Sequence, residues 1–215
     1  NINSKKINNI YLPGIKLSKK INATSELKDF KNTDFLFVVI PVQFASNILK
    51  KLKGIINDRC TIINASKGIE VKSLSLVGDI ATKIFPKNKI AILSGPNFAK
   101  EIALGNPTAS LIAALNIKHA KVISDLIRSK YFRPYLSNDV IGAQICGAMK
   151  NVYAIGCGII VGKKFGENAV ASIISRSFSE IKLVCLRLGG DTETLMGLSG
   201  ICLLYTSPSP RDSDS

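Results

Sequence analysis

The sequence has no tryptophan and only one histidine, and no two of its cysteines form a CxxC pair. A single imidazole, His119, is too few for a histidine metal cluster, and its polar surroundings do not suggest a Ser-His-Asp triad. The cysteine count is odd and most of the cysteines lie in apolar segments, which predicts reduced, buried thiols in a cytoplasmic protein. The cysteines are Cys60, Cys146, Cys157, Cys185 and Cys202. We therefore expect no metal site and no disulfide framework.

Acidic residues are scarce, with 15 Asp and Glu against 29 Lys and Arg, so the formal net charge is +14. No apolar run approaches the roughly 18 residues of a membrane span, so no membrane-spanning segment is expected. The 46% hydrophobic content and mean hydropathy of +0.22 exclude intrinsic disorder. The positive charge favours anionic ligands such as nucleotides, phosphorylated metabolites or nucleic acid. Most basic residues are lysines interspersed with Asn and Ile, which favours solvated helix faces over a nucleic-acid footprint.

Two features of the ends bear on the interpretation. The chain opens at Asn1 and both methionines are interior, so we expect the true start to lie upstream and judge no targeting signal. Residues 203–215 form a Ser/Pro/Asp-rich tail unlike the rest of the chain, which predicts non-native sequence there.

Strand and helix patterns alternate over residues 1–136. Residues 35–42 are a continuous apolar run typical of a strand buried on both faces, and further strands are expected from Cys60, Ile90, Ala109 and Phe132. Helical spacing follows the first of these strands, with Phe44, Ile48, Leu49 and Leu52 on the apolar face. It recurs over residues 71–84, with Val71 and Leu74 on the apolar face, and over 118–130. This alternation predicts a doubly wound parallel α/β sheet of the Rossmann type.

The pattern changes after Asn138. Residues 138–159 are rich in Gly and Ala with a helical period, and a second amphipathic helix is expected from Glu167. We therefore predict an all-helical C-terminal domain over residues 137–202 after a nucleotide-binding domain over residues 1–136.

Ligands of doubly wound sheets bind beyond the carboxyl ends of the strands, which here precede residues 41–44, 66–68 and 94–99. Backbone amides, glycine and Lys67 at such turns suit an anion, although ordinary turns have the same composition. Lys150 lies within an otherwise apolar helix, with Gly147 one turn earlier and Asn151 beside it. A buried lysine near another cation has a lowered pKa and can exchange protons near neutral pH, whereas a lysine that reaches out to solvent has no such role.

Ten segments in order resemble the bacterial-type NAD(P)-dependent glycerol-3-phosphate dehydrogenase family. The most specific are SKG at 66–68, SGPNFAKEI from Ser94 and GAMKNVYAI from Gly147. The others are YLPGIKL, INAT, VVIPVQ, NPTA, FRPY, GENA and MGLSG. The resemblance spans residues 10–202.

This resemblance implies reduction of dihydroxyacetone phosphate to sn-glycerol 3-phosphate by NADH or NADPH, for glycerophospholipid synthesis in the cytoplasm. By position, Lys150 matches the family's catalytic lysine, which exchanges the proton of the substrate oxygen. Lys67 matches a second catalytic lysine that lies between cofactor and substrate. The expected ligand contacts follow from the same matches. They are Lys67, Gly95, Asn97, Lys150 and Asn151 for the substrate, and Pro41, Phe44, Lys67 and Ala99 for the cofactor.

The chain departs from the family pattern at several positions. Asn97 stands where Ser or Thr is usual, and Gln144 and Cys146 stand where Glu and Gly are usual. No G-x-G-x-x-G occurs, and the resemblance is expected to end near Cys202. We therefore expect this polypeptide to be inactive on its own. We expect the complete enzyme to be a homodimer. Two alternatives stay open: a related two-domain hydroxy-acid dehydrogenase, and a non-enzymatic basic module that binds anions or nucleic acid.

Overall fold

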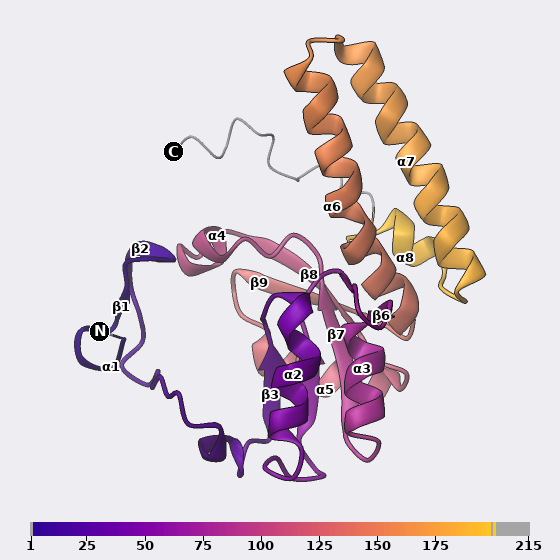
Figure 1. The fold of residues 1–215 in the computed structure, drawn as a ribbon. Helices are drawn as coiled ribbons and strands as arrows, with labels where there is room; N and C mark the ends of the chain where they lie inside the picture. The colour runs from indigo at the N-terminus through magenta and orange to yellow at the C-terminus, as the bar shows by residue number, and fades with distance from the viewer. Residues whose placement is uncertain (1, 199, 201–215) are drawn as a thin grey trace.

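The computed structural model describes residues 2–198 and residue 200, and its centre is a five-stranded sheet (Figure 1). The strand order is β3-β4-β7-β8-β9. The strands are β3 (Phe35–Val38), β4 (Thr61–Asn64), β7 (Lys89–Ser94), β8 (Thr108–Ala113) and β9 (Phe132–Ser137). All four residues of β4 are buried, as the apolar run predicts for a strand covered on both faces.

The sheet is mixed, so the expectation of a wholly parallel sheet is wrong at one position. β3, β4 and β7 are parallel, and β8 and β9 are parallel, but β8 runs antiparallel to β7. A parallel crossover must return along the length of the strand, about 20 Å for the six residues of β7. Crossovers between parallel strands usually contain a helix that packs along the sheet, and the only helix in residues 95–107 is α4 (Ala99–Ala103), about 7 Å long. The chain therefore enters β8 from the edge at which it left β7.

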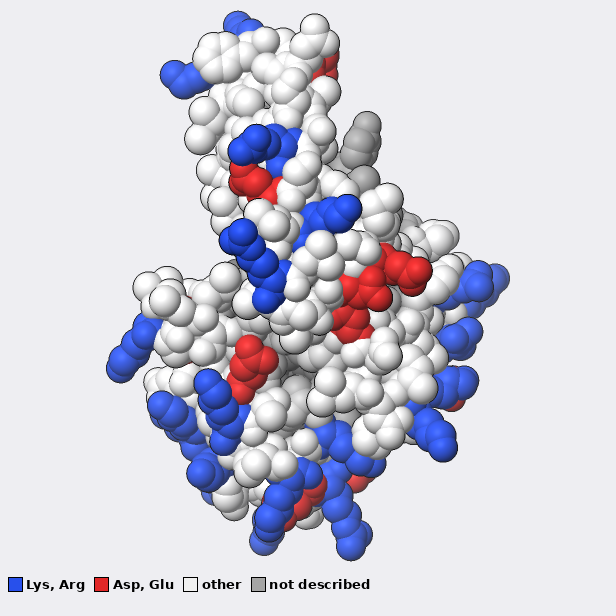
Figure 2. All heavy atoms as spheres, turned by 90° about the vertical axis from the view of Figure 1, so that its right-hand side faces the viewer, with Lys and Arg blue, Asp and Glu red and all other residues white. Residues whose placement is uncertain are grey.

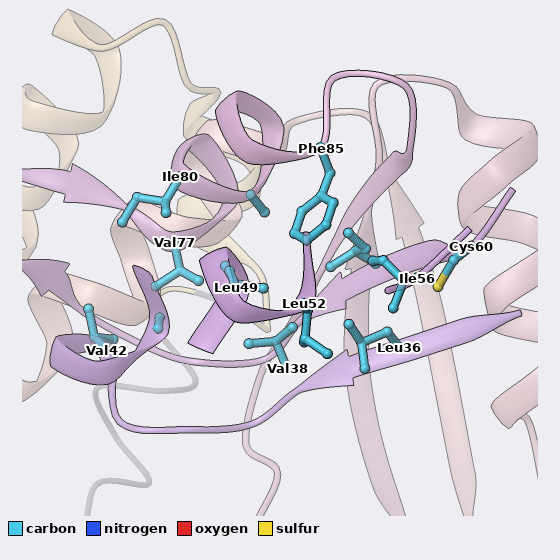
Figure 3. Packing of buried hydrophobic residues seen from close by; sticks show 13 residues of the cluster. Leu36, Val38, Val42, Leu49, Leu52, Ile56, Cys60, Val77, Ile80 and Phe85 are labelled. Atoms are coloured by element: carbon cyan, nitrogen blue, oxygen red, sulfur yellow. The ribbon is translucent and has the colours of Figure 1, made fainter. Parts of the chain in front are cut away.

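Helices cover both faces of the sheet. On one face lie α2 (Val42–Leu52) and α3 (Val77–Ile84), whose buried side chains form one core with β3 and β4 (Figure 3). On the other face α5 (Ile117–Ile127) packs Ala120 and Ile123 against Ile63 and Ile112. Ile62 and Ile63 are both fully buried but belong to different cores, because successive side chains of a strand point to opposite faces.

The segment after Lys67 is a hairpin of β5 (Ile69–Glu70) and β6 (Ser75–Leu76), which corrects the prediction of a helix from Val71. The helix begins at Val77, and the side chains of Val71 and Leu74 are 73% and 80% exposed. The Ser73 hydroxyl donates a hydrogen bond to Glu70, and Leu74 has φ of +52°. Spacing alone cannot separate the two structures, because a short strand pair and the first turn of a helix can carry the same apolar residues.

The C-terminal part is a hairpin of α6 (Val140–Gly162) and α7 (Glu167–Arg187), followed by α8 (Thr192–Met196) (Figure 1). The Asp139 carboxylate accepts hydrogen bonds from the Gly142 amide at 2.7 Å and from the Asp191 amide at 2.8 Å. It therefore caps α6 and ties it to the turn before α8. Because β9 ends at the edge opposite Lys67, α6 runs back along the sheet before it reaches that edge.

α6 is long and apolar enough to span a membrane by length and composition, which the sequence expectation had excluded. The core helix of a soluble protein meets the same criterion. Here the residues of α6 from Gly142 to Ala148 are buried against the sheet and the helical hairpin.

The remaining elements lie near the N-terminus and contain no fully buried residue, although Leu27 and Phe30 pack against the core of β3 and α2. These elements are α1 (Ile2–Lys5), β1 (Ile7–Asn8), β2 (Leu12–Lys16) and the 3-10 helix η1 (Leu27–Phe30). The tail predicted to be non-native lies outside the described residues.

Candidate active site

Three of the predicted site segments meet at one edge of the sheet. β3, β4 and β7 are parallel, so the turns that follow them, at residues 39–41, 65–68 and 95–98, lie at the same edge. This is the position at which open α/β sheets bind ligands.

The backbone before Lys67 is held by buried and half-buried side chains. Asn64 is 1% exposed. Its side chain accepts a hydrogen bond from the backbone N–H of Ser66 at 3.0 Å and donates one to the backbone carbonyl of Ser66 at 3.2 Å. The Ser66 hydroxyl in turn accepts from the Ile40 amide and donates to the Val38 carbonyl. Sequence reasoning assigned no role to Asn64. The signal available was a polar residue at the end of an otherwise apolar strand.

The backbone after Lys67 is held to the start of α2. The Gln43 side chain accepts from the Val71 amide and donates to the Ile69 carbonyl, both at 3.0 Å. These contacts on either side of Lys67 restrict the direction in which its side chain leaves the sheet edge.

Lys67 reaches across to the turn after β7. Its Nζ donates to the Gly95 carbonyl at 2.8 Å. Burial, together with the nearby charge of Lys150, lowers the pKa of Lys67 from 10.5 to about 8. Lys67 can therefore change its protonation state close to neutral pH.

Lys150 approaches the same place from α6. A Cβ atom at Gly147, one turn before Lys150, would lie 3.4 Å from Lys67 Cγ and 3.6 Å from Ser94 Oγ. The backbone of Gly147 therefore lies next to the methylene stem of Lys67. Burial also lowers the pKa of Lys150. The structure brings together two lysines with lowered pKa, one from each predicted domain.

Gly95 has a backbone conformation and a packing environment that only glycine accommodates. Its φ is +130°, and an added Cβ would lie 3.2 Å from the Cα of Ser110 on β8. We expect Gly95→Ala to lower the free energy of unfolding by about 1–3 kcal/mol more than the same substitution does at a glycine that has open space around it. Urea unfolding measures this.

Gly54→Ala is the matched control for Gly95→Ala. Gly54 also has a positive φ, +81°, but an added Cβ meets nothing within 4 Å. Equal losses of stability in the two variants would contradict the importance of close packing between Gly95 and β8.

Two polar atoms in the same turn have no hydrogen-bond partner among the described residues. They are the buried Ser94 Oγ and Asn97 Oδ1. Buried polar groups are rarely left without a partner, so these two oxygens are suited to hydrogen-bond a ligand or water at this edge. Ser94 was part of the turn selected from the sequence, but no role was predicted for it.

The other predicted contact residues are exposed. Phe44 in the first turn of α2 is 61% exposed, and Pro41 precedes it as the N-cap residue. The helical spacing had placed Phe44 on the buried face of α2, which is wrong: Val42, Ala45, Leu49 and Leu52 form that face. Ala99 begins α4 and Asn151 follows Lys150 on α6, both exposed. In residues 2–198 and 200 no three His, Cys, Asp or Glu side chains group closely enough to hold a metal ion.

Comparison with known proteins identifies the family. The profile of the NAD-dependent glycerol-3-phosphate dehydrogenase N-terminus matches residues 1–120, and that of the C-terminus matches residues 139–213. This chain belongs to the NAD-dependent glycerol-3-phosphate dehydrogenase family. The C-terminal match extends past Cys202, so the resemblance reaches further along the chain than the motifs indicated.

Two curated relatives carry the name glycerol-3-phosphate dehydrogenase [NAD(P)+]. The protein of Parvibaculum lavamentivorans is 41% identical over 98% of this chain, and that of Zymomonas mobilis is 44% identical over 93%. The chain spans 64% and 58% of their lengths. The crystal structure of glycerol-3-phosphate dehydrogenase from Coxiella burnetii superposes with a TM-score of 0.92 at 30% identity, covering 98% of this chain and 66% of that one.

Membership in the glycerol-3-phosphate dehydrogenase family accounts for the Rossmann-type sheet followed by a helical domain. The residues at the sheet edge also suit the family's cofactor. Phe44 offers an exposed apolar ring and Lys67 a cation, a combination that fits a ligand with both aromatic and anionic parts.

Proposed function

We propose that the complete protein reduces dihydroxyacetone phosphate to sn-glycerol 3-phosphate with NADH or NADPH, a reaction that supplies the backbone of glycerophospholipids. The observation that carries the proposal is the pair of lysines with lowered pKa, Lys67 and Lys150, beside Gly95 at the ligand-binding edge. The family supports it, since its curated members bear the name of this activity.

In this proposal each lysine has a separate task. Lys150 is the general acid that gives a proton to the carbonyl oxygen of the substrate, and in the oxidation direction it is the base. Lys67 places its ammonium where negative charge develops on that oxygen and stabilises it. Gly95, Asn97 and Asn151 bind the substrate beside the lysines.

The cofactor would be held by Pro41, Phe44, Lys67 and Ala99, and its nicotinamide supplies the hydride when bound. No G-x-G-x-x-G for the pyrophosphate occurs in the sequence, so the proposal assigns no residue to that part of the cofactor.

The charge distribution supports small anionic ligands over nucleic acid. Figure 2 shows Lys and Arg side chains scattered over one face and interrupted by uncharged and acidic surface, with no continuous basic stripe. A nucleic-acid partner therefore stays outside the proposal. The described cysteines Cys60, Cys146, Cys157 and Cys185 are free thiols, which supports a reducing, cytoplasmic location. We also predict that the complete protein is a homodimer. Analytical ultracentrifugation measures its oligomeric state.

The experiment is to express the complete reading frame and follow oxidation of NADH and of NADPH with dihydroxyacetone phosphate. Oxidation of either nucleotide supports the proposal, and the ratio of kcat/KM values identifies the preferred one. A folded protein that ignores dihydroxyacetone phosphate but reduces another ketone from a panel of keto acids would replace it with the hydroxy-acid dehydrogenase alternative. Tight, steeply salt-dependent binding to duplex DNA without any reductase activity would favour the binding module.

A further inference from the structure

A buried hydrogen bond connects the segment that carries Lys67 to the helix that carries Lys150. The amide of Gly78 donates to Oε1 of Gln144 at 2.8 Å. Gln144 is 6% exposed, so water does not compete for this bond. Neither residue touches the reacting groups described above.

The two ends of this bond belong to the two lysines. Gly78 is the second residue of α3, which follows Lys67 through the β5–β6 hairpin. Gln144 lies on α6 six residues before Lys150, a rise of about 9 Å along the helix axis. A displacement of α6 along the sheet at Gln144 therefore moves Lys150 by the same amount relative to Lys67.

Any side chain at Gly78 would displace the Gln144 amide. An added Cβ would lie 2.6 Å from Gln144 Oε1 and 2.9 Å from Gln144 Cδ. The Gln144 amide is thus seated directly on the backbone of α3. Its Nε2 is buried without a hydrogen-bond partner among the described residues. An unpartnered buried donor destabilises a fold, so stability alone does not explain a glutamine here.

The neighbouring contacts of α6 with the sheet do little to fix its position along the helix axis. Ala143 packs on Ile92 and Ala113, and Gly147 lies against the Lys67 stem. Apolar contact of small side chains is non-directional and tolerates sliding, whereas a short hydrogen bond fixes one register.

We propose that Gln144 is a positioning residue, which fixes the placement of the Lys150 ammonium relative to Lys67 by holding α6 to the start of α3. Its consequence for turnover rests on the proposed function. Its consequence for the two lysines does not.

The test uses Gln144→Met in the complete protein, because methionine keeps the length and volume of the side chain and removes the acceptor. The first measurement is amide hydrogen exchange at Gly78, which we expect to become at least tenfold faster. Gln144→Glu keeps an oxygen in place and is expected to retain slow exchange. Unchanged exchange at Gly78 in Gln144→Met would overturn the proposal.

The second measurement is the titration of Lys67 by NMR of lysine labelled with ¹³C, with its signal assigned by its loss in Lys67→Met. Burial and, second to it, the proximity of Lys150 hold the pKa of Lys67 at about 8, and a displacement of α6 changes both. Loosening of α6 in Gln144→Met is therefore expected to move the pKa of Lys67 toward 10.5. A titration identical to that of the unmodified protein would assign Gln144 a structural role only and overturn the proposal.

Ser177→Ala is the matched control. Ser177 on α7 is 1% exposed and its hydroxyl also lacks a partner among the described residues, but it belongs to the helical hairpin and makes no bond to α3. Its replacement is expected to leave the Lys67 titration unchanged. An equal shift in Ser177→Ala would attribute the effect to general loosening and overturn the proposal.

In steady-state kinetics Gln144→Met is expected to lower kcat at least tenfold, with KM values changed less than about twofold, because misplacement acts on the reaction more than on binding. A rise in KM with kcat unchanged would overturn the positioning role. If the unmodified protein has no reductase activity while the Lys67 titration still shifts, the proposed function fails and the positioning of the two lysines stands.

Discussion

Replacing Lys150 with methionine is expected to lower kcat for reduction of dihydroxyacetone phosphate by about 10²- to 10⁴-fold, the usual contribution of a general acid. Lys150 reaches the sheet edge from α6, and burial lowers its pKa, so it can release a proton more readily than an exposed lysine. Methionine retains the apolar stem and loses only the ammonium. The fold is therefore expected to survive, and thermal unfolding checks that it does.

Lys150→Arg distinguishes the effect of the positive charge at this position from the effect of proton transfer. A guanidinium keeps the positive charge but holds its proton at any pH at which the protein is folded. We expect the arginine variant to bind substrate nearly as well as the unmodified protein and to turn over as slowly as Lys150→Met. An arginine variant with kcat close to that of the unmodified protein would show that Lys150 acts through its charge and not as an acid.

The direction of the pH dependence follows from the same role. Reduction needs protonated Lys150, so its rate is expected to fall as the pH rises through the lowered pKa. Oxidation of sn-glycerol 3-phosphate needs the neutral amine, so its rate is expected to rise over the same range. Profiles of kcat in both directions measure this, and two profiles that move together would contradict the assignment.

Replacing Lys67 with methionine is expected to remove activity and, at pH 7, to stabilise the fold by about 2 kcal/mol. The pKa of Lys67 falls from 10.5 in the unfolded chain to about 8 in the folded one, which corresponds to about 3 kcal/mol of unfavourable interaction for the charged form. The lost bond to the Gly95 carbonyl offsets about 1 kcal/mol of the gain.

The stabilisation by Lys67→Met decreases as the pH rises. Below pH 8 Lys67 is charged in both states, and the folded state carries the full cost. Between pH 8 and 10.5 the unfolded chain binds more protons than the folded one, so the stability contributed by this group rises with pH. Above pH 10.5 the cost has vanished, and the advantage of Lys67→Met is expected to disappear with it.

Urea unfolding of the unmodified protein and of Lys67→Met at pH 7, 9 and 10.5 measures the difference. Lys118→Met is the matched control, since Lys118 is exposed on α5 and its replacement is expected to change stability by less than about 0.5 kcal/mol. A Lys67→Met variant that is less stable than the unmodified protein at pH 7 would mean that the site does not strain the charged lysine.

Much of the fold could be predicted from local patterns in the sequence. The runs that begin at Phe35, Cys60 and Ile90 became β3, β4 and β7, because short apolar runs bounded by turn residues are typical of strands covered on both faces. The α6–α7 hairpin followed from helical periodicity. Lys67 and Lys150 were selected because each interrupts its apolar or turn context with a cation. Their roles in catalysis remain predictions that the variants above test.

The sequence by itself determined the class of fold, the position of most elements and the family, because these depend on periodicity and on short motifs. Tertiary structure decided the rest. It set the direction of β8, which no long crossover helix precedes, and the hairpin after Lys67, whose hydrogen bonds lead to α2. It also brought Lys67 beside Lys150 and Gly78 beside Gln144. These pairs lie far apart along the chain and meet only through the return of α6 along the sheet, a path that no local pattern encodes.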